Sequence, residues 1–278
     1  MKKKYCQNLI KTPLLAFALA TGVATAGTTE TVAPAPVAPS EDLISGVLSL
    51  SANSHFVSYG NDVWKDGSSM SELGFNPSLE FTFKLPADGF SLILGTWWDV
   101  NDKGAPSIGG QIQEIDVWAG IGYTYDKFSI TTTYQAWNYN RGTEQILDVK
   151  LAYACFLNPS LTFHNRLDEG GSGGADGTIA VLGVSHTLEA GPFSISFPAN
   201  FAAIVSDNYY GGAAGSDSGY AYTSVGAQAS YPLAFMGESY GKWSLTGGLT
   251  QYWTNGPVIP GNPTNNFLTY NFGLTATF

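Results

Sequence analysis

The sequence predicts an all-β fold, a transmembrane antiparallel up-and-down β-barrel of about 12 strands. The first observation behind this prediction is composition, because only 12% of the 278 residues are charged whereas 14% are aromatic. The mean hydropathy is 0.00, which is too low for a protein built of membrane helices, and so few charges would cover a soluble surface poorly. The second observation is a repeated period-two alternation of apolar and polar residues, and the third is the form of the last strand.

The first 26 residues are predicted to be a secretory signal peptide. Four lysines, Lys2, Lys3, Lys4 and Lys11, precede an apolar run at 14–20 that is too short to span a bilayer. Residues 24–26 then form a small-residue cleavage site of the A-x-A type. After cleavage near Ala26, residues 27–42 form a linker rich in Pro and Ala, and residues 43–278 form the barrel. This order predicts a bacterial outer-membrane protein whose linker lies in the periplasm.

Cleavage makes an acidic chain more acidic and removes one of its two cysteines. The full chain has a formal net charge of −10, and the loss of four lysines leaves eight basic against 22 acidic residues, or −14. This charge argues against nucleic-acid binding, which requires a basic surface. It favours a lumen that prefers cations, and the alternative is that acidic loops simply keep the surface solvated. Cys6 is removed, so Cys155 has no disulfide partner within the mature chain.

Twelve alternating segments account for the rest of the chain. Their predicted spans are 46–59, 76–85, 90–100, 112–125, 128–139, 145–157, 160–167, 177–188, 193–205, 219–231, 242–253 and 267–278. Short turns are expected at 86–89, 126–127, 158–159 and 189–192, with a longer one at 232–241. Longer loops rich in Gly, Asp and Asn are expected at 60–75, 101–111, 168–176, 206–218 and 254–266. Short turns on one side and long loops on the other are typical of outer-membrane barrels.

The last strand carries the clearest pattern. Leu268, Tyr270, Phe272, Leu274, Ala276 and Phe278 form one apolar face, and Asn271, Gly273, Thr275 and Thr277 form the other. A barrel has no free edge, so this strand must close against the first one. We interpret Phe278, Phe272 and Tyr270 as the signal recognised by the barrel-assembly machinery. The alternative is an ordinary C-terminal strand of a periplasmic sandwich.

Aromatic residues near the predicted strand ends indicate two interfacial girdles in contact with outer-membrane lipid and lipopolysaccharide. The alternative is the core of a soluble all-β protein. The girdle residues are predicted to be Phe83, Phe90, Trp97, Trp98, Tyr123, Tyr125, Phe128, Tyr134, Tyr153, Phe193, Tyr231, Trp243 and Trp253.

Four stretches within residues 48–140 resemble the TorF porin family of outer-membrane barrels. They are 50–60 (LSANSHFVSYG), which resembles the family's opening strand, 76–80 (NPSLE), 89–100 (GFSLILGTWWDV) and 114–123 (EIDVWAGIGY). The resemblance implies a porin-like barrel without a defined substrate. The family's turn carries an arginine, whereas Ser58 and Tyr59 stand in this turn. If that arginine lines the family's pore, its selectivity does not transfer to this chain.

Charged residues on the predicted lumen side are the candidate pore lining, together with His164. They are Glu80, Lys84, Asp99, Glu114, Asp116, Asp148, Lys150 and Arg166. Rings of charged side chains select ions in wide pores. The alternative is that these charges pair with one another and plug a narrow barrel, because small barrels fill their interiors with side chains.

Catalytic, metal and cofactor sites are not predicted. A barrel lipase would need a Ser–His pair, and the candidates are His164 with Asn165 on one strand and Ser185 with His186 on the next. We favour lumen or rim positions for these histidines. The acids of the 168–176 and 206–218 loops lack the ligand spacing of a calcium loop.

The sequence therefore predicts a porin-like outer-membrane channel for passive diffusion of small hydrophilic solutes or ions, with a preference for cations. Two alternatives stay open. The first is a non-conducting structural or adhesion barrel that acts through its outer loops, and the second is a barrel lipid hydrolase.

Overall fold

A computed structural model describes residues 43–278 except 66–72, 104–106, 169–174, 208 and 212–217. The predicted signal peptide and linker lie outside the described residues. Within the described part of the chain, no helix has the length and apolar character needed to cross a membrane.

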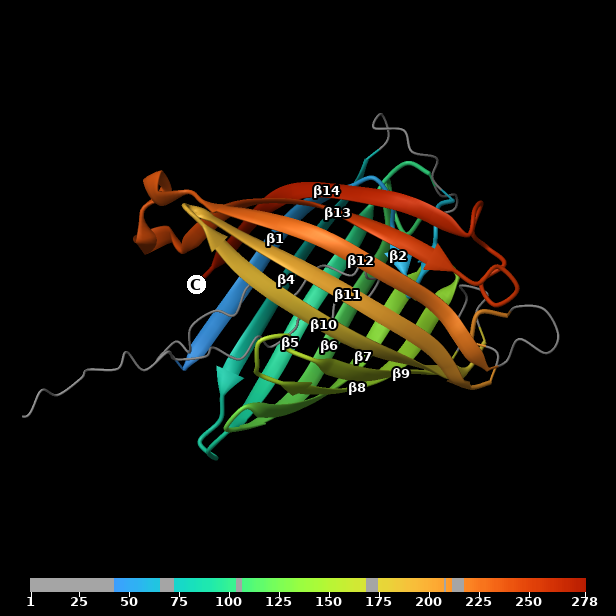
Figure 1. The fold of residues 1–278 in the computed structure, drawn as a ribbon, viewed down its shortest axis with the longest axis horizontal. Helices are drawn as coiled ribbons and strands as arrows, with labels where there is room; N and C mark the ends of the chain where they lie inside the picture. Colours follow the sequence, from blue (N-terminus) through green and yellow to red (C-terminus); the bar gives the residue numbers. More distant parts are fainter. Residues whose placement is uncertain (1–42, 66–72, 104–106, 169–174, 208, 212–217) are drawn as a thin grey trace, which may run out of the picture.

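Twelve antiparallel strands form one closed barrel, as the sequence predicted (Figure 1). They are β1 (Ile44–Asn53), β4 (Gly74–Lys84), β5 (Phe90–Val100), β6 (Ile112–Tyr125), β7 (Phe128–Tyr139), β8 (Gly142–Tyr153), β9 (Ser160–Asp168), β10 (Gly177–Ala190), β11 (Phe193–Ser206), β12 (Gly219–Pro232), β13 (Lys242–Thr254) and β14 (Asn266–Thr277). Each strand pairs with its neighbour in sequence, and β1 closes the ring by pairing with both β4 and β14. Closure leaves no strand edge unpaired.

The two ends of the barrel differ in their connections. At one end, called here the short-turn end, β1 begins and β14 ends. Short connections such as 126–127 and 191–192 also lie at this end. The connection at 233–241 is longer and contains two 3-10 turns, Ala234–Met236 and Glu238–Tyr240. The opposite end, called the long-loop end, holds most of the longer connections, although β7 and β8 are joined there by two residues only. The alternation is the topology expected from the sequence.

Two predicted strands have the wrong bounds. The first was expected to continue to Tyr59, but β1 stops at Asn53 and the chain then turns into the barrel. The sixth was expected at 145–157, but β8 spans Gly142–Tyr153, and residues 154–159 form the connection to β9. The bounds of the other ten strands agree with the prediction within two residues.

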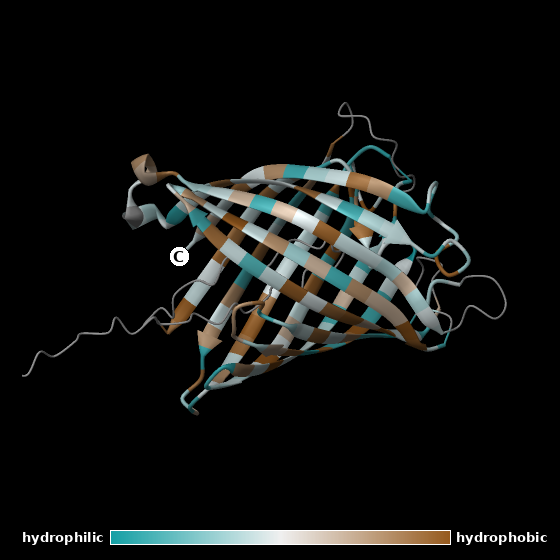
Figure 2. Ribbon diagram, viewed as in Figure 1, coloured by the Kyte–Doolittle hydropathy of each residue, from teal (hydrophilic) through white to brown (hydrophobic). Residues whose placement is uncertain are grey.

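Hydrophobic and more hydrophilic residues alternate along the strands (Figure 2), and exposed apolar side chains come from strands all around the ring. Large apolar side chains such as Leu94, Val117, Leu182, Phe201, Val225, Leu249 and Phe272 are 38% to 51% exposed on the outer face. Most predicted girdle residues lie on this face, including Phe90, Trp98, Tyr125, Phe128, Tyr153 and Trp253. Trp97 was predicted wrongly, because it is 3% exposed and packs inside the barrel against Phe56.

The seam between β1 and β14 closes at the C-terminus. Phe278 exchanges two backbone hydrogen bonds with Gly46, of 2.6 and 3.0 Å. Its ring covers Gly46 so closely that a Cβ atom at this position would clash with it. The Phe278 and Phe272 side chains are 53% and 49% exposed on the outer face. Their role as an assembly signal, with Tyr270, stays a prediction.

The inner face has two halves of different character. Toward the short-turn end it carries mostly Gly, Ser and Thr; for example, a Cβ on Gly122 would lie 2.7 Å from Ser91 Oγ. Several register pairs on the inner face join two small residues: Gly122 with Thr131, Ser160 with Gly183, Ser194 with Ser230, Ser230 with Thr246, Thr246 with Gly273, Ser244 with Thr275, and Ser49 with both Ser78 and Thr275. Lys150 interrupts this pattern between Thr131 and Thr162. Toward the long-loop end the inner face carries large side chains, and the main apolar cluster of the molecule lies there.

Candidate functional site in the barrel lumen

A short hairpin enters the lumen from the long-loop end. It consists of β2 (Val57–Ser58) and β3 (Asn61–Asp62), joined by Tyr59 and Gly60. These two turn residues have φ values of 46° and 81°. Positive φ at both central positions is the geometry of a type I′ turn, which suits a tight hairpin. The segment 54–64, called here the lumen hairpin, was predicted as the end of the first strand and the start of a loop.

The lumen hairpin crosses the barrel to the opposite wall. It begins after β1, and β9 lies six strands away from β1 in either direction around the ring. The Tyr59 ring nevertheless stacks on His164 of β9, with centroids 3.8 Å apart and an angle of 28° between the planes. At Gly60, a Cβ atom would lie 2.5 Å from the ring of Tyr222 on β12. The hairpin tip therefore contacts two parts of the wall that are distant from its own strand.

Hydrogen bonds from other loops hold the hairpin in place. Asn262, between β13 and β14, accepts from the Asp62 backbone N–H at 2.7 Å and donates to the Gly60 carbonyl at 2.8 Å. The hydroxyl of Tyr210, between β11 and β12, donates to the Tyr59 carbonyl. At the hairpin base, Trp64 Nε1 donates to Asp99 Oδ2 at 2.8 Å.

The hairpin completes an apolar cluster across the lumen. Phe56 packs on Trp97 with ring centroids 4.9 Å apart. Val57 and Tyr59 of the hairpin also belong to this cluster. Other members come from the wall and from two inward-folded loops: Ile93, Trp118, Trp137, Ile146, Ile179, Tyr209, Tyr222, Tyr252, Val258 and Ile259. Side chains thus fill much of the long-loop half in this conformation.

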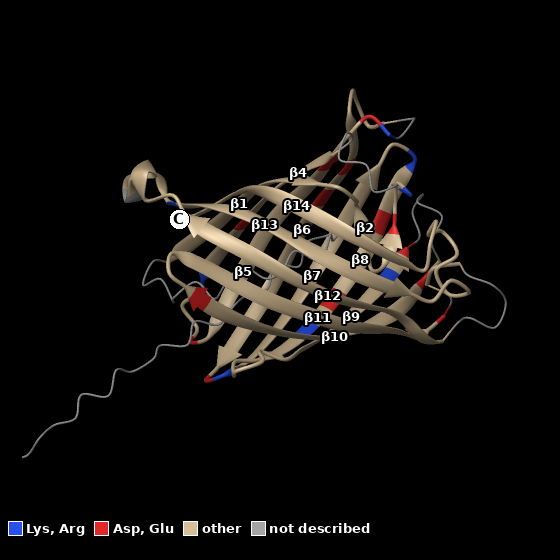
Figure 3. Cartoon of the chain, turned by 45° about the horizontal axis from the view of Figure 1, so that its top comes forward, with Lys and Arg blue, Asp and Glu red and all other residues tan. Residues whose placement is uncertain are grey.

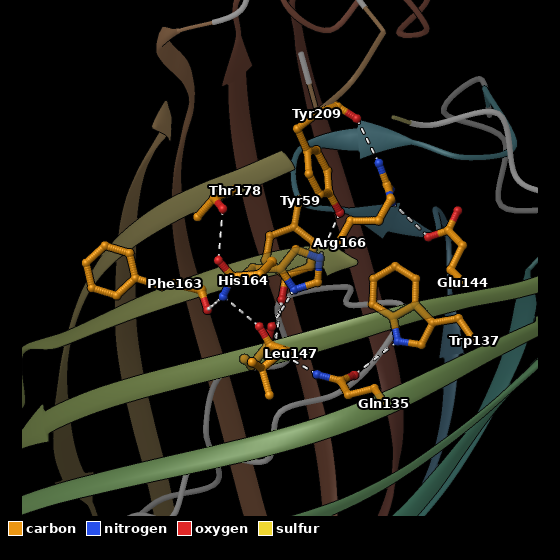
Figure 4. A network of polar contacts seen from close by, with 12 residues as sticks. Tyr59, Gln135, Trp137, Glu144, Leu147, Phe163, His164, Arg166, Thr178 and Tyr209 are labelled. Atoms are coloured by element: carbon orange, nitrogen blue, oxygen red, sulfur yellow. Dashed lines mark hydrogen bonds and ion pairs between the residues drawn. The ribbon is translucent and has the colours of Figure 1, made fainter. Parts of the chain in front are cut away.

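A polar network links the hairpin to the wall (Figure 4). Asp148 Oδ1 lies 2.6 Å from His164 Nδ1, and the Tyr209 hydroxyl lies 2.8 Å from His164 Nε2. Burial raises the pKa of the Tyr209 phenol, so this hydroxyl keeps its proton. A carboxylate accepts only, so Asp148 accepts from Nδ1–H and the neutral ring accepts from Tyr209. Gln135 Nε2 also donates to Asp148, at 2.7 Å.

The predicted pore-lining residues differ in their exposure, and Figure 3 marks the charged residues along the strands and loops. Glu80, Asp99, Glu114, Asp116, Asp148 and Arg166 are buried, Lys150 is half-buried, and Lys84 is exposed at the short-turn rim. Whether they line a conducting path stays a prediction. With Asp62 of the hairpin and Glu144, the buried charged residues of the described chain are seven acids and one arginine.

Glu144 was missed by the sequence prediction. Its carboxylate accepts from Arg166 Nε at 3.1 Å and is fully buried. The alternation could have revealed it, because Glu144 lies an even number of residues from Asp148 and Lys150 and therefore shares their face of the strand. The predicted strand started one residue too late to include it.

A cavity of 420 Å³ lies between the hairpin and the wall at the long-loop end. Its wall is aromatic and charged, and it is formed by Phe56, Ser58, Asn61, Asp62, Val63, Lys65, Glu114, Trp137, Tyr139, Glu144, Arg166, Tyr209, Tyr210, Ile259, Pro260 and Gly261. This volume is within the range of sites for small organic molecules.

The Ser–His arrangement of a barrel lipase does not form. His164 pairs in register with Ile179, so Ser185 and His186 lie roughly 20 Å farther along β10. His186 instead contacts the Phe156 carbonyl at 2.8 Å near the short-turn end. Among the described residues, no group of three or more His, Cys, Asp or Glu side chains is arranged to hold a metal ion.

Comparisons with known proteins return outer-membrane barrels. No family profile and no curated protein sequence matches the chain, so the TorF resemblance stays a prediction. Among solved structures, the COG4313 outer membrane channel from Pseudomonas putida F1 is similar with a TM-score of 0.48 and 14% identity, covering 84% of this chain and 95% of that one. The KdgM porin has a TM-score of 0.47 and 10% identity, covering 84% and 99%. The NanC porin has a TM-score of 0.44 and 10% identity, covering 82% and 98%.

Proposed function

We propose that this protein is a porin-like channel of the bacterial outer membrane that lets small hydrophilic solutes diffuse passively, with a preference for cations. The short-turn end would face the periplasm and the long-loop end the cell exterior. An outer face of exposed Leu, Val and Phe around a closed barrel supports a position in lipid, because a soluble protein would have to cover it.

The observation that carries the proposal is the inner face of the short-turn half. A barrel that served only as a scaffold would gain stability from filling its interior with large side chains. Here Gly, Ser and Thr occupy many of the inward positions, for example Ser91, Gly122 and Gly183. Small hydroxyl-bearing side chains leave room for water beneath the lumen hairpin.

The excess of buried acids in the other half supports the preference for cations. Seven acids against one arginine give the buried part of the lumen an excess of groups that can carry a negative charge. Fixed charge of one sign in a narrow, weakly screened passage attracts ions of the opposite sign.

A non-conducting barrel is the second candidate, and a specific observation favours it. The lumen hairpin and the loop carrying Val258 and Ile259 pack together with aromatic wall residues across the long-loop half. If this cluster never opens, the outer loops alone would carry the function.

Single-channel recording separates the two candidates. Residues 27–278 are refolded and inserted into a planar bilayer, and the reversal potential is measured across a salt gradient. The channel proposal expects discrete conductance steps with a cation-selective reversal potential that moves toward zero in the double variant Glu114→Gln/Asp116→Asn. The matched control Glu189→Gln removes an exposed charge at the short-turn rim and should leave the potential unchanged. A folded barrel that inserts and never conducts would contradict the channel.

A further inference from the structure

Three acids on the strands of the long-loop half, Glu114, Asp116 and Glu144, have buried oxygens without a hydrogen-bond donor. Glu114 Oε1, Glu144 Oε1 and both carboxylate oxygens of Asp116 are buried and accept no hydrogen bond from the described residues. The three residues are 3% exposed or less. By contrast, Glu80 accepts from Trp118 Nε1 at 3.0 Å, and Asp99 accepts from Trp64 and two asparagines. Glu114 also lies within hydrogen-bonding distance of Asp116 and Tyr139. The remaining oxygens have no donor, and a carboxylate oxygen buried without one is costly, so a further donor would be favourable here.

The three acids lie side by side on the wall. Register pairs Asp116 on β6 with Trp137 on β7, and Trp137 with Glu144 on β8. Glu114 lies two residues from Asp116 on the same face and pairs with Tyr139. Glu114, Trp137, Tyr139 and Glu144 all border the 420 Å³ cavity. Glu114, Glu144 and the two aromatic rings thus form one part of the cavity wall, and Asp116 lies beside them on β6 without bordering the cavity.

The two cationic side chains that border this cavity do not satisfy the acids. Arg166 Nε donates to Oε2 of Glu144, which leaves Oε1 without a donor. Arg166 Nη1 donates to the carbonyls of Tyr209 and Ala175 at 2.7 and 3.1 Å. Its guanidinium lies 3.9 Å above the Tyr209 ring, which shows that this wall accommodates a cation against an aromatic face. Lys65 is exposed, at the base of the hairpin.

The chemistry of the wall indicates the class of ligand. No described group of acids converges closely enough to hold a metal ion, so the missing donor belongs to a larger cation. A primary ammonium offers three hydrogen-bond donors and a positive charge, and it binds favourably to the faces of Trp and Tyr. The cavity volume allows a molecule of a few carbon atoms beside the ammonium.

We propose that this cavity is a binding site for a small organic cation bearing a primary ammonium group, with Glu114 and Glu144 as its acceptors. The unpartnered oxygens lie just behind the cavity surface, so the Glu114 side chain turns toward the cavity when the ammonium enters. That this cation is a solute carried by the channel rests on the proposed function, whereas binding itself does not.

The test measures binding without conduction. Residues 27–278 are refolded in detergent and titrated by calorimetry with 1,4-diaminobutane, the neutral 1,4-butanediol and the anionic succinate. These probes have the same four-carbon chain length and differ in the charge of their ends. The proposal expects the diamine alone to bind, with heat that saturates at one molecule per barrel.

The variant Glu114→Gln is expected to weaken diamine binding about tenfold or more, because a charge-assisted acceptor is lost. Glu80→Gln is the matched control, since it removes a buried acid that does not border the cavity, and it should bind as the wild type does. Folding of each variant is checked by the heat-dependent shift of the barrel on a gel. Absence of diamine binding to the folded wild type, equal binding of the diol, or unchanged affinity in Glu114→Gln would each overturn the site. Diamine binding to a barrel that does not conduct would support the site and contradict only the channel.

Discussion

The ring of Tyr59 stacks on that of His164 at 3.8 Å, although the two residues come from opposite sides of the barrel. Tyr59 sits at the tip of the lumen hairpin and His164 at the middle of β9. Both ring nitrogens of His164 are hydrogen-bonded, Nδ1 to Asp148 and Nε2 to Tyr209. The stack therefore connects the hairpin to a hydrogen-bonded side chain of the far wall, and we expect it to oppose displacement of the hairpin.

Tyr59→Ala is expected to loosen the hairpin. An aromatic pair contributes about 0.5–1.5 kcal/mol beyond its buried area, so the population of barrels with a displaced hairpin should rise roughly 2- to 10-fold. Single-channel recordings would show this rise as a larger open fraction. Tyr59→Phe is the control, because it keeps the ring and removes the hydroxyl, which lies 3.5 Å from Asp148 Oδ2. Equal open fractions in Tyr59→Ala and the wild type would show that the stack does not hold the hairpin.

Asn262→Ala tests whether the loop between β13 and β14 holds the lumen hairpin in place. The Asn262 side chain bonds to Asp62 of β3 and to Gly60 of the hairpin turn, and each bond is worth about 0.5–1.5 kcal/mol. Proteolysis of the folded barrel should then cut residues 54–64 faster than in the wild type. Asn165→Ala loses two side-chain bonds to wall carbonyls, away from the hairpin, and should leave that rate unchanged. Identical cutting rates in the two variants would show that Asn262 does not hold the hairpin in place.

Gly273→Ala tests the seam that closes the barrel. A Cβ atom at this position would clash with the Leu50 carbonyl oxygen and lie 2.9 Å from Ser51 Cα, and backbone atoms of a paired strand cannot move aside cheaply. We expect the folded gel band to be lost at a lower temperature than in the wild type. Gly109→Ala is the control, since no atom lies within 4 Å of the added Cβ. A seam that tolerates Gly273→Ala with no loss of heat resistance would contradict the register of β1 and β14.

The wall of the barrel could be predicted from the sequence because lipid on one side and a polar lumen on the other impose a strict period of two. The same rule placed Glu80, Asp116 and Asp148 on the inner face. It failed where the chain leaves the wall. The large hydrophobic residues of 54–59 predicted a continuation of the first strand. In the structure Phe56, Val57 and Tyr59 instead pack in the lumen.

Two signals pointed to a filled lumen. The strand 90–100 is apolar on both faces, with Ile93 and Trp97 at inward positions. Such residues need an apolar partner inside, and Phe56 is the partner of Trp97. The alternation of β1 also breaks at Ser54, which stands at an outward position. The cavity could not have been predicted, because it depends on three loops that meet only in the folded barrel.

The most direct test of the central claim removes the lumen hairpin and measures conductance. Asn53 and Gly74 pair directly across β1 and β4, so a two-residue Asn-Gly turn can join them in place of residues 54–73 without disturbing the wall. Single-channel conductance of this variant is compared with that of the wild type in the same bilayer. A channel narrowed by the hairpin predicts a conductance several times larger in the variant, with a folded barrel by gel shift. Equal conductance would show that the hairpin does not narrow the path, and a folded variant that still conducts nothing would contradict the channel itself.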